Sequence, residues 1–302
     1  MKSLRRLSIP IGIATLMALL AGCGENLAPP YGETLGPPEN LKALSKDSTT
    51  VILQWTKPQS GSDTSLAGYQ VEFLGSSVAV GAAALNYAAT GLPPGPISFS
   101  VRTKMKDGRT SDAVSITWAA AYRYAENYVL TEHWYQDIAR SSGLDVGHSL
   151  RPPLAMPMEF PNAAQLVDVW LVGGGTVANG TASPLRLLSA SAYQPAYQLA
   201  RFSTTSHQSS SLDYFLAQYP GGIDSIGVTL SDNTIYYVLV EGPNATYCTA
   251  RLHVRFLGGT FPNRQVAITI SLQRSPNVSY AEAAADRISA FALAPPLLAV
   301  IP

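Results

Sequence analysis

The sequence predicts an all-β protein built from two consecutive β-sandwiches. Apolar and polar residues alternate with a period of two in many short segments, and turn residues such as Asp-Gly and Pro-Gly separate these segments. Such alternation indicates half-buried antiparallel strands, whose apolar face needs a second sheet to cover it. No run of helical period separates the strand-like segments of the C-terminal half, which argues against parallel βαβ units there.

The chain begins with the layout of a secretory signal. Basic residues near the start precede an apolar run from Ile9 to Leu20, and small residues follow it. This run is shorter than the ~20 residues that a membrane-spanning helix needs. We therefore expect residues 1–22 to be a cleaved signal peptide rather than a transmembrane helix.

The stretch Leu20-Ala21-Gly22-Cys23 resembles the lipobox of bacterial lipoproteins. The resemblance implies that Cys23 becomes the new N-terminus and carries a diacylglyceryl group and a further acyl chain such as palmitate. The expected location is the bacterial cell envelope, with the membrane as a partner through the lipid. Some lipoproteins are retained at the inner membrane by an aspartate directly after the cysteine, and this position is occupied by Gly24. In a two-membrane bacterium the outer membrane is therefore expected. Residues 23–36 are rich in Gly and Pro and predict a tether.

Residues 37–120 predict the first sandwich. Its expected inward-facing positions alternate with polar ones in four segments: Val51, Leu53 and Trp55; Tyr69, Val71 and Phe73; Ile97, Phe99 and Val101; Val114, Ile116 and Trp118. Five landmarks in this region resemble a fibronectin type III domain: Pro37 to Leu41, Trp55 to Pro58, Gly68 to Val71, Leu92 to Gly95 and Ser111 to Val114. In bacterial exported proteins, this resemblance implies a spacer or an interaction module.

Residues 121–302 predict a second, larger β-sandwich or jelly-roll. Tyr128 to Ala139 is consistent with a short helix or a strand pair, and Leu166 to Val172 is apolar enough for a central strand. Further expected strands are Ser225 to Leu230, Ile235 to Val240, and a hairpin of Arg251 to Phe256 with Val266 to Leu272. Tyr280 to Leu293 lacks Gly and Pro and predicts a short terminal helix.

Charge and cysteine content limit the possible functions. Lys plus Arg and Asp plus Glu balance at 20 each, so nothing in the composition suggests a nucleic-acid partner. With Cys23 assigned to lipid, Cys248 has no second cysteine for an internal disulfide. Its apolar, strand-like context predicts a buried, inert thiol.

Motif inspection predicts no catalytic residue, metal or cofactor. Ser149 resembles the serine of a nucleophile elbow, but Arg151 and Pro152 stand where a close helix backbone requires a small residue. The glycines at 173–175 lack the helix and the acidic residue of a dinucleotide site. Metal-capable side chains cluster without zinc-protease spacing, which leaves a calcium site as the alternative to solvated side chains: Glu132, His133, Asp137, Asp145 and His148.

Arg251, His253 and Arg255 are the candidate ligand-binding residues. They alternate with Leu252, Val254 and Phe256, so they should share one strand face and offer cations to an anionic ligand. A plain solvated strand face is the alternative interpretation.

The predicted function is that of a lipid-anchored cell-envelope protein that binds, adheres or assembles without catalysis. Its expected partner is a surface glycan or an envelope protein. The alternative is an exported hydrolase of polysaccharide or peptidoglycan with a fibronectin-like spacer. A concave face with two carboxylates ~5–10 Å apart would favour the hydrolase.

Overall fold

The computed structural model describes residues 35–61, 63–147, 151–173, 183–241 and 246–278. Cys23, His148, Ser149 and the helix expected at 280–293 lie outside these residues. The described strands are β1 (Glu39–Asp47), β2 (Thr50–Thr56), β3 (Leu66–Phe73), β4 (Ser76–Gly81), β5 (Asn86–Ala89), β6 (Pro96–Met105), β7 (Val114–Ala119), β8 (Tyr122–Arg123), β9 (Tyr128–Thr131), β10 (Gly143–Asp145), β11 (Leu154–Met156), β12 (Val169–Gly173), β13 (Leu185–Ser189), β14 (Ala200–Gln208), β15 (Ile223–Ser225), β16 (Gly227–Thr229), β17 (Thr234–Glu241), β18 (Tyr247–Gly258) and β19 (Gln265–Gln273).

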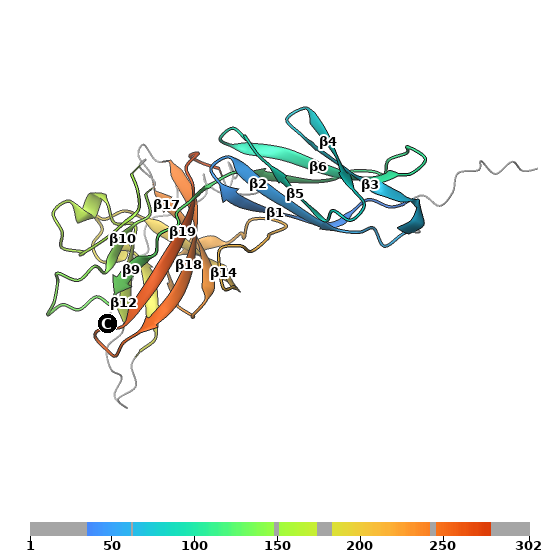
Figure 1. Cartoon of the computed structure of the whole chain (residues 1–302). Helices are drawn as coiled ribbons and strands as arrows, with labels where there is room; N and C mark the ends of the chain where they lie inside the picture. Colours follow the sequence, from blue (N-terminus) through green and yellow to red (C-terminus); the bar gives the residue numbers. More distant parts are fainter. Residues whose placement is uncertain (1–34, 62, 148–150, 174–182, 242–245, 279–302) are drawn as a thin grey trace, which may run out of the picture.

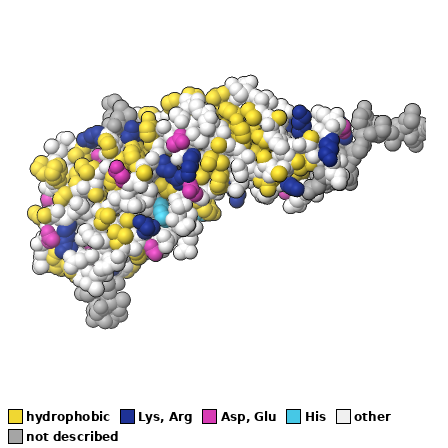
Figure 2. Space-filling view, in the orientation of Figure 1, with side chains coloured by type: hydrophobic (Ala, Val, Ile, Leu, Met, Phe, Trp, Pro, Cys, Tyr) yellow, Lys and Arg dark blue, Asp and Glu magenta, His cyan; other side chains and the backbone are white. Residues whose placement is uncertain are grey.

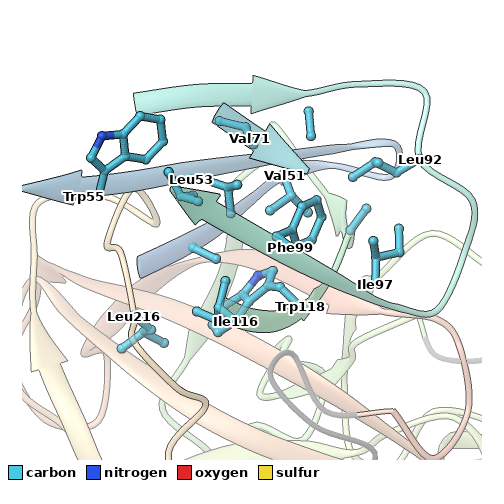
Figure 3. Packing of buried hydrophobic residues seen from close by; sticks show 14 of the residues in the cluster. Val51, Leu53, Trp55, Val71, Leu92, Ile97, Phe99, Ile116, Trp118 and Leu216 are labelled. Carbon is cyan, nitrogen blue, oxygen red and sulfur yellow. The ribbon is translucent and has the colours of Figure 1, made fainter. Parts of the chain in front are cut away.

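Strands β1 to β7 form the first sandwich. A three-stranded sheet ordered β1-β2-β5 faces a four-stranded sheet ordered β4-β3-β6-β7. The period-two pattern explains the packing, because every second side chain of β2 and β6 points into the core while its neighbours reach solvent. Trp55 is 1% exposed and lies in the same core as Phe99 and Trp118 (Figure 3).

Strands β8 to β19 form the second sandwich, which lies end to end with the first (Figure 1). Its larger sheet has the order β15-β14-β17-β18-β19-β8, with β9 also paired to β19. Its smaller sheet has the order β11-β10-β12-β13-β16. The expected hairpin is present as the antiparallel pair β18 and β19, and β12 lies at the centre of its sheet, as predicted.

The strand expected at Ile235 to Val240 is present as β17, but buried and exposed residues do not alternate along it. All of its residues from Thr234 to Val240 are buried. Tyr236 and Val238 face the core of the second sandwich, whereas Ile235 and Tyr237 belong to the core that continues into the first. A strand covered on both faces has an almost continuous apolar sequence.

The connection between the sandwiches is short and buried. Ala120 and Ala121 separate β7 from β8 and are 4% and 1% exposed. The Gln273 side chain donates to the Ala120 carbonyl at 2.8 Å, and the Ala121 amide donates to the Asp47 carbonyl at 3.2 Å. Both neighbours therefore hold this connection, which makes it unlike an exposed, flexible linker.

Residues 128–139 form a strand at their start, not a helix. Strand β9 takes Tyr128–Thr131 and is followed by turns. Within the described ranges the helical segments are single 3₁₀ turns, η1 (Asp63–Ser65), η2 (Ala163–Gln165) and η3 (Ala190–Ala192). The described residues also contain no helix long and apolar enough to cross a membrane.

Candidate functional site

The connection between β14 and β15 joins the two sandwiches. We call these residues, 209–222, the junction strap. The strap extends from the second sandwich to β1, where Leu216 and Ala43 exchange two backbone hydrogen bonds of 2.9 and 3.1 Å (Figure 1). The Leu216 side chain is 7% exposed and belongs to the core of the first sandwich, on the side of Ile116 and Trp118 (Figure 3).

Arg251 of β18 forms hydrogen bonds with the backbone of the strap. Its Nη2 donates to the carbonyl of Leu212 at 3.1 Å and to that of Tyr214 at 3.0 Å. The arginine is 1% exposed, and a buried charge is tolerated only when hydrogen bonds replace its hydration. The two carbonyls belong to residues outside the β-sheets, and Arg251 provides the hydrogen bonds that a sheet would otherwise supply. Arg251 therefore fixes the path of the strap.

His253, two residues further along β18, holds the beginning of the strap. Its Nε2 lies 2.9 Å from the Ser209 carbonyl oxygen. A carbonyl only accepts, so Nε2 carries the hydrogen. Burial lowers the pKa of His253; nearby Arg255 lowers it further, while the Ser209 hydrogen bond and Asp232 oppose this. Burial also lowers the pKa of His207, which packs against the strap residue Tyr214 at a ring-centroid distance of 4.6 Å.

Asp213 of the strap forms ion pairs with both sandwiches. Its Oδ1 lies 2.7 Å from Arg123 Nη1 in β8 and 3.5 Å from Lys46 Nζ in β1. The hydrogen bond from Arg123 is the main reason that the pKa of Asp213 lies below its usual value. These side chains are partly exposed, so solvent screens the pairs and limits their contribution to stability.

A groove of about 430 Å³ opens beside these ion pairs. Both sandwiches and the strap contribute to its lining, and polar and apolar atoms line it in similar measure. The lining residues are Lys46, Arg123, Tyr124, Ala125, Asn127, Ser210, Ser211, Leu212, Asp213, His253, Arg255 and Thr269. We call it the junction groove. Where the sandwiches meet, the visible face carries lysine or arginine side chains beside acidic ones, with a histidine close by (Figure 2).

The three predicted ligand residues differ in their surroundings in the structure. Arg251 and His253 lie under the strap, with exposures of 1% and 3%, so the expectation of an open cationic face is wrong for these two. Arg255 lies beyond the strap and is exposed. Its side chain makes no hydrogen bond or ion pair with the described residues, and both Arg255 and His253 line the groove.

The metal-capable side chains around residue 140 are dispersed into separate contacts. Buried Glu132 binds Arg264 through two bonds of 2.6 and 2.7 Å, and His133 lies 3.2 Å from Glu159. Asp137 pairs with Arg140 at 2.8 Å. No group of three His, Cys, Asp or Glu side chains that could hold a metal occurs among the described residues.

Cys248 is a free, buried cysteine, 3% exposed. Burial raises the pKa of its thiol to about 11. The reactive form of cysteine is the thiolate, so this thiol is protonated and unreactive at neutral pH.

Sequence reasoning missed Lys46, Arg123 and Asp213. Lys46 is separated from Asp213 by 167 positions, and Arg123 is separated from it by 90. No spacing pattern links residues that only a tertiary contact brings together. The one available signal is the strap itself, a long connection between strands that contains several apolar residues, among them Leu212, Phe215, Leu216 and Tyr219.

No protein-family model matches the chain, and no curated protein matches it. Solved structures of fibronectin type III domains do match it. The FN5 domain of Drosophila Lar is 23% identical, with a TM-score of 0.24, covering 29% of this chain and 97% of that one. The sixth fibronectin type III domain of human fibronectin type III domain containing protein 3 is 22% identical, with a TM-score of 0.22, covering 28% and 84%.

The central fibronectin-III array of RIM-binding protein extends over more of the chain. It is 13% identical, with a TM-score of 0.25, and covers 73% of each chain. The strand order itself shows that the protein is all-β with several antiparallel sheets, and the solved structures reported above are fibronectin type III domains. This likeness concerns the fold alone.

Proposed function

We propose that this chain is a lipid-anchored protein of a bacterial cell envelope that binds an envelope component without catalysis. The lipobox-like stretch ending at Cys23 supports the anchor. The junction groove supports binding, and it is the observation that carries this part of the proposal. Its position between the sandwiches gives a partner access to both of them at once.

The charges in the groove favour binding over hydrolysis. Three of its lining side chains are cationic, those of Lys46, Arg123 and Arg255. Asp213 is the one carboxylate among the described lining residues, and ion pairs already engage it. A glycosidase mechanism uses two carboxylates that flank the scissile bond. A cationic surface with a single paired acid is suited to holding an anionic partner.

Replacement of the lipidated thiol tests the anchor. The Cys23→Ser variant should move from the membrane fraction to the soluble fraction and keep the mass of the uncleaved precursor, because a hydroxyl does not accept the lipid. Cell fractionation and intact mass spectrometry provide the measurements. A variant that stays in the membrane with the wild-type mature mass would contradict the proposal. Cys248→Ser is the matched control and should leave both location and processing unchanged.

A further inference from the structure

We propose that the junction groove binds an acidic oligosaccharide, with Arg255 pairing with a sugar carboxylate. This inference rests on the proposed binding function and names the ligand class. Arg255 is exposed, and its side chain has no ion-pair or hydrogen-bonding partner among the described residues. Guanidinium matches a carboxylate through two parallel N–H···O bonds.

The charge at the groove suits a single carboxylate. Asp213 is shared by Lys46 and Arg123, so this group of three keeps one net positive charge. Arg255 adds a second positive charge, and burial lowers the pKa of nearby His253, which disfavours a charged imidazole there. Two net positive charges distributed along an open groove attract the carboxylate of a sugar acid. A doubly charged phosphate binds best where several cations lie close together, and the cations of this groove are spread out.

The other lining groups suit sugar hydroxyls. Ser210 is exposed and has no hydrogen-bond partner in the described part of the chain. Asn127 accepts a hydrogen bond from Thr269 at 2.9 Å through its Oδ1, which leaves its amide N–H groups as donors. Leu212 and Ala125 are the aliphatic lining residues. Hydroxyl groups that both donate and accept hydrogen bonds match the polar groups of this lining, and the carbon atoms of a sugar ring can contact its apolar atoms.

The rigidity of the groove favours a small ligand. Its volume of about 430 Å³ falls within the range of small-molecule sites. Arg251 and the Leu216–Ala43 pair hold the strap that forms one wall. Preorganised walls reduce the entropy lost on binding.

Calorimetric titration of the purified full chain tests the proposal. The ligands are a linear tetramer of uronic acid, its neutral methyl ester, inorganic phosphate and an octaglutamate peptide. We expect the uronate tetramer to bind at least about tenfold more tightly than each of the other three. Its affinity should fall between 50 and 300 mM salt because the recognised group is charged.

Two arginine variants locate the site. Arg255→Gln should weaken binding of the uronate tetramer at least about tenfold, the loss expected when one charged hydrogen-bonding pair is removed. Arg186→Gln is the matched control, because Arg186 is an exposed strand arginine of the other sheet, and its affinity should stay within about twofold. Circular dichroism of both variants should match that of the wild type.

Each contrary outcome has a defined meaning. Equal binding of the methyl ester, or full binding by Arg255→Gln, overturns the role of Arg255. Equal binding of octaglutamate overturns the saccharide in favour of an acidic protein partner, and equal binding of phosphate leaves only a general anion site. No binding of the tetramer at millimolar concentration overturns the inference and leaves the Cys23 anchor test unaffected. Release of new reducing ends from the tetramer would instead contradict the non-catalytic function.

Discussion

At the residue scale, His207 and His253 connect the junction to pH. Both contact the strap, His207 through the Tyr214 ring and His253 through the Ser209 carbonyl. Both have a lowered pKa, chiefly because of burial. The charged groups that face them are Arg251 for His207, and Arg255 and Asp232 for His253.

The free energy of unfolding should therefore fall on mild acidification. A histidine with a depressed pKa in the folded protein binds protons more readily when unfolded, so stability is full above pH ~6.5 and is lost as pH falls below it. Urea denaturation at pH 7.5, 6.5 and 5.5 measures this slope. The double variant His207→Phe with His253→Gln should show a shallower slope, even if it starts less stable. An identical slope would show that other groups cause the dependence.

Arg251 illustrates a limit of sequence reasoning at this scale. The alternation of Arg251, His253 and Arg255 with apolar neighbours correctly places them on one face of β18. Alternation does not reveal what covers a face, and here a distant strap covers two of the three. The burial of Trp55 was predicted correctly for the converse reason. Its inward-facing neighbours Val51 and Leu53 are close in sequence, and the sheet that covers them shows the same period-two alternation.

At the scale of elements, the strap acts as a clamp between the sandwiches. It places Leu212, Leu216 and Tyr219 among the buried residues of the first core. Tyr219 also donates from its hydroxyl to the Ala250 carbonyl at 3.1 Å. Long connections without regular structure are uncommon in compact domains, and the buried contacts of this one indicate a structural role beyond linking two strands.

Truncation of the clamp should destabilise the whole chain. Leu216→Ala removes a side chain from a closed core and should cost about 2–5 kcal/mol of unfolding free energy. Leu74→Ala is the matched control, because Leu74 is 58% exposed, and it should change stability by less than about 0.5 kcal/mol. Chemical denaturation measures both. A Leu216→Ala loss no larger than that of the control would show that the strap only rests on the surface.

At the scale of the whole molecule, the sandwiches should unfold together. One core includes residues of both, the connection at 120–121 is buried, and the strap bridges to β1. Calorimetry of the wild type should show one transition, with equal calorimetric and van't Hoff enthalpies. Two separated transitions would mean that the sandwiches are energetically independent despite their contacts.

The fold was more predictable than the site. Alternation in β2, β3 and β6 reports a core on one side and water on the other, so the sequence indicates an all-β sandwich directly. The same signal is weak in β17, where both faces are buried. The groove depends on Lys46, Arg123 and Asp213, which the strap brings together from distant positions. Local pattern carries no information on such a contact, so only Arg255 and His253 of the lining were predicted.

The strap also bears on inheritance. Fibronectin-like units are commonly regarded as independent domains that recombination can exchange between proteins. A genetic exchange after residue 120 would separate the first sandwich from Leu212, Leu216 and Tyr219. In another protein, its hydrophobic core would then be incompletely filled. Selection would then act against such chimaeras, so the two sandwiches should be inherited together. Substitutions at Ala43 and Leu216 should also co-vary among homologues.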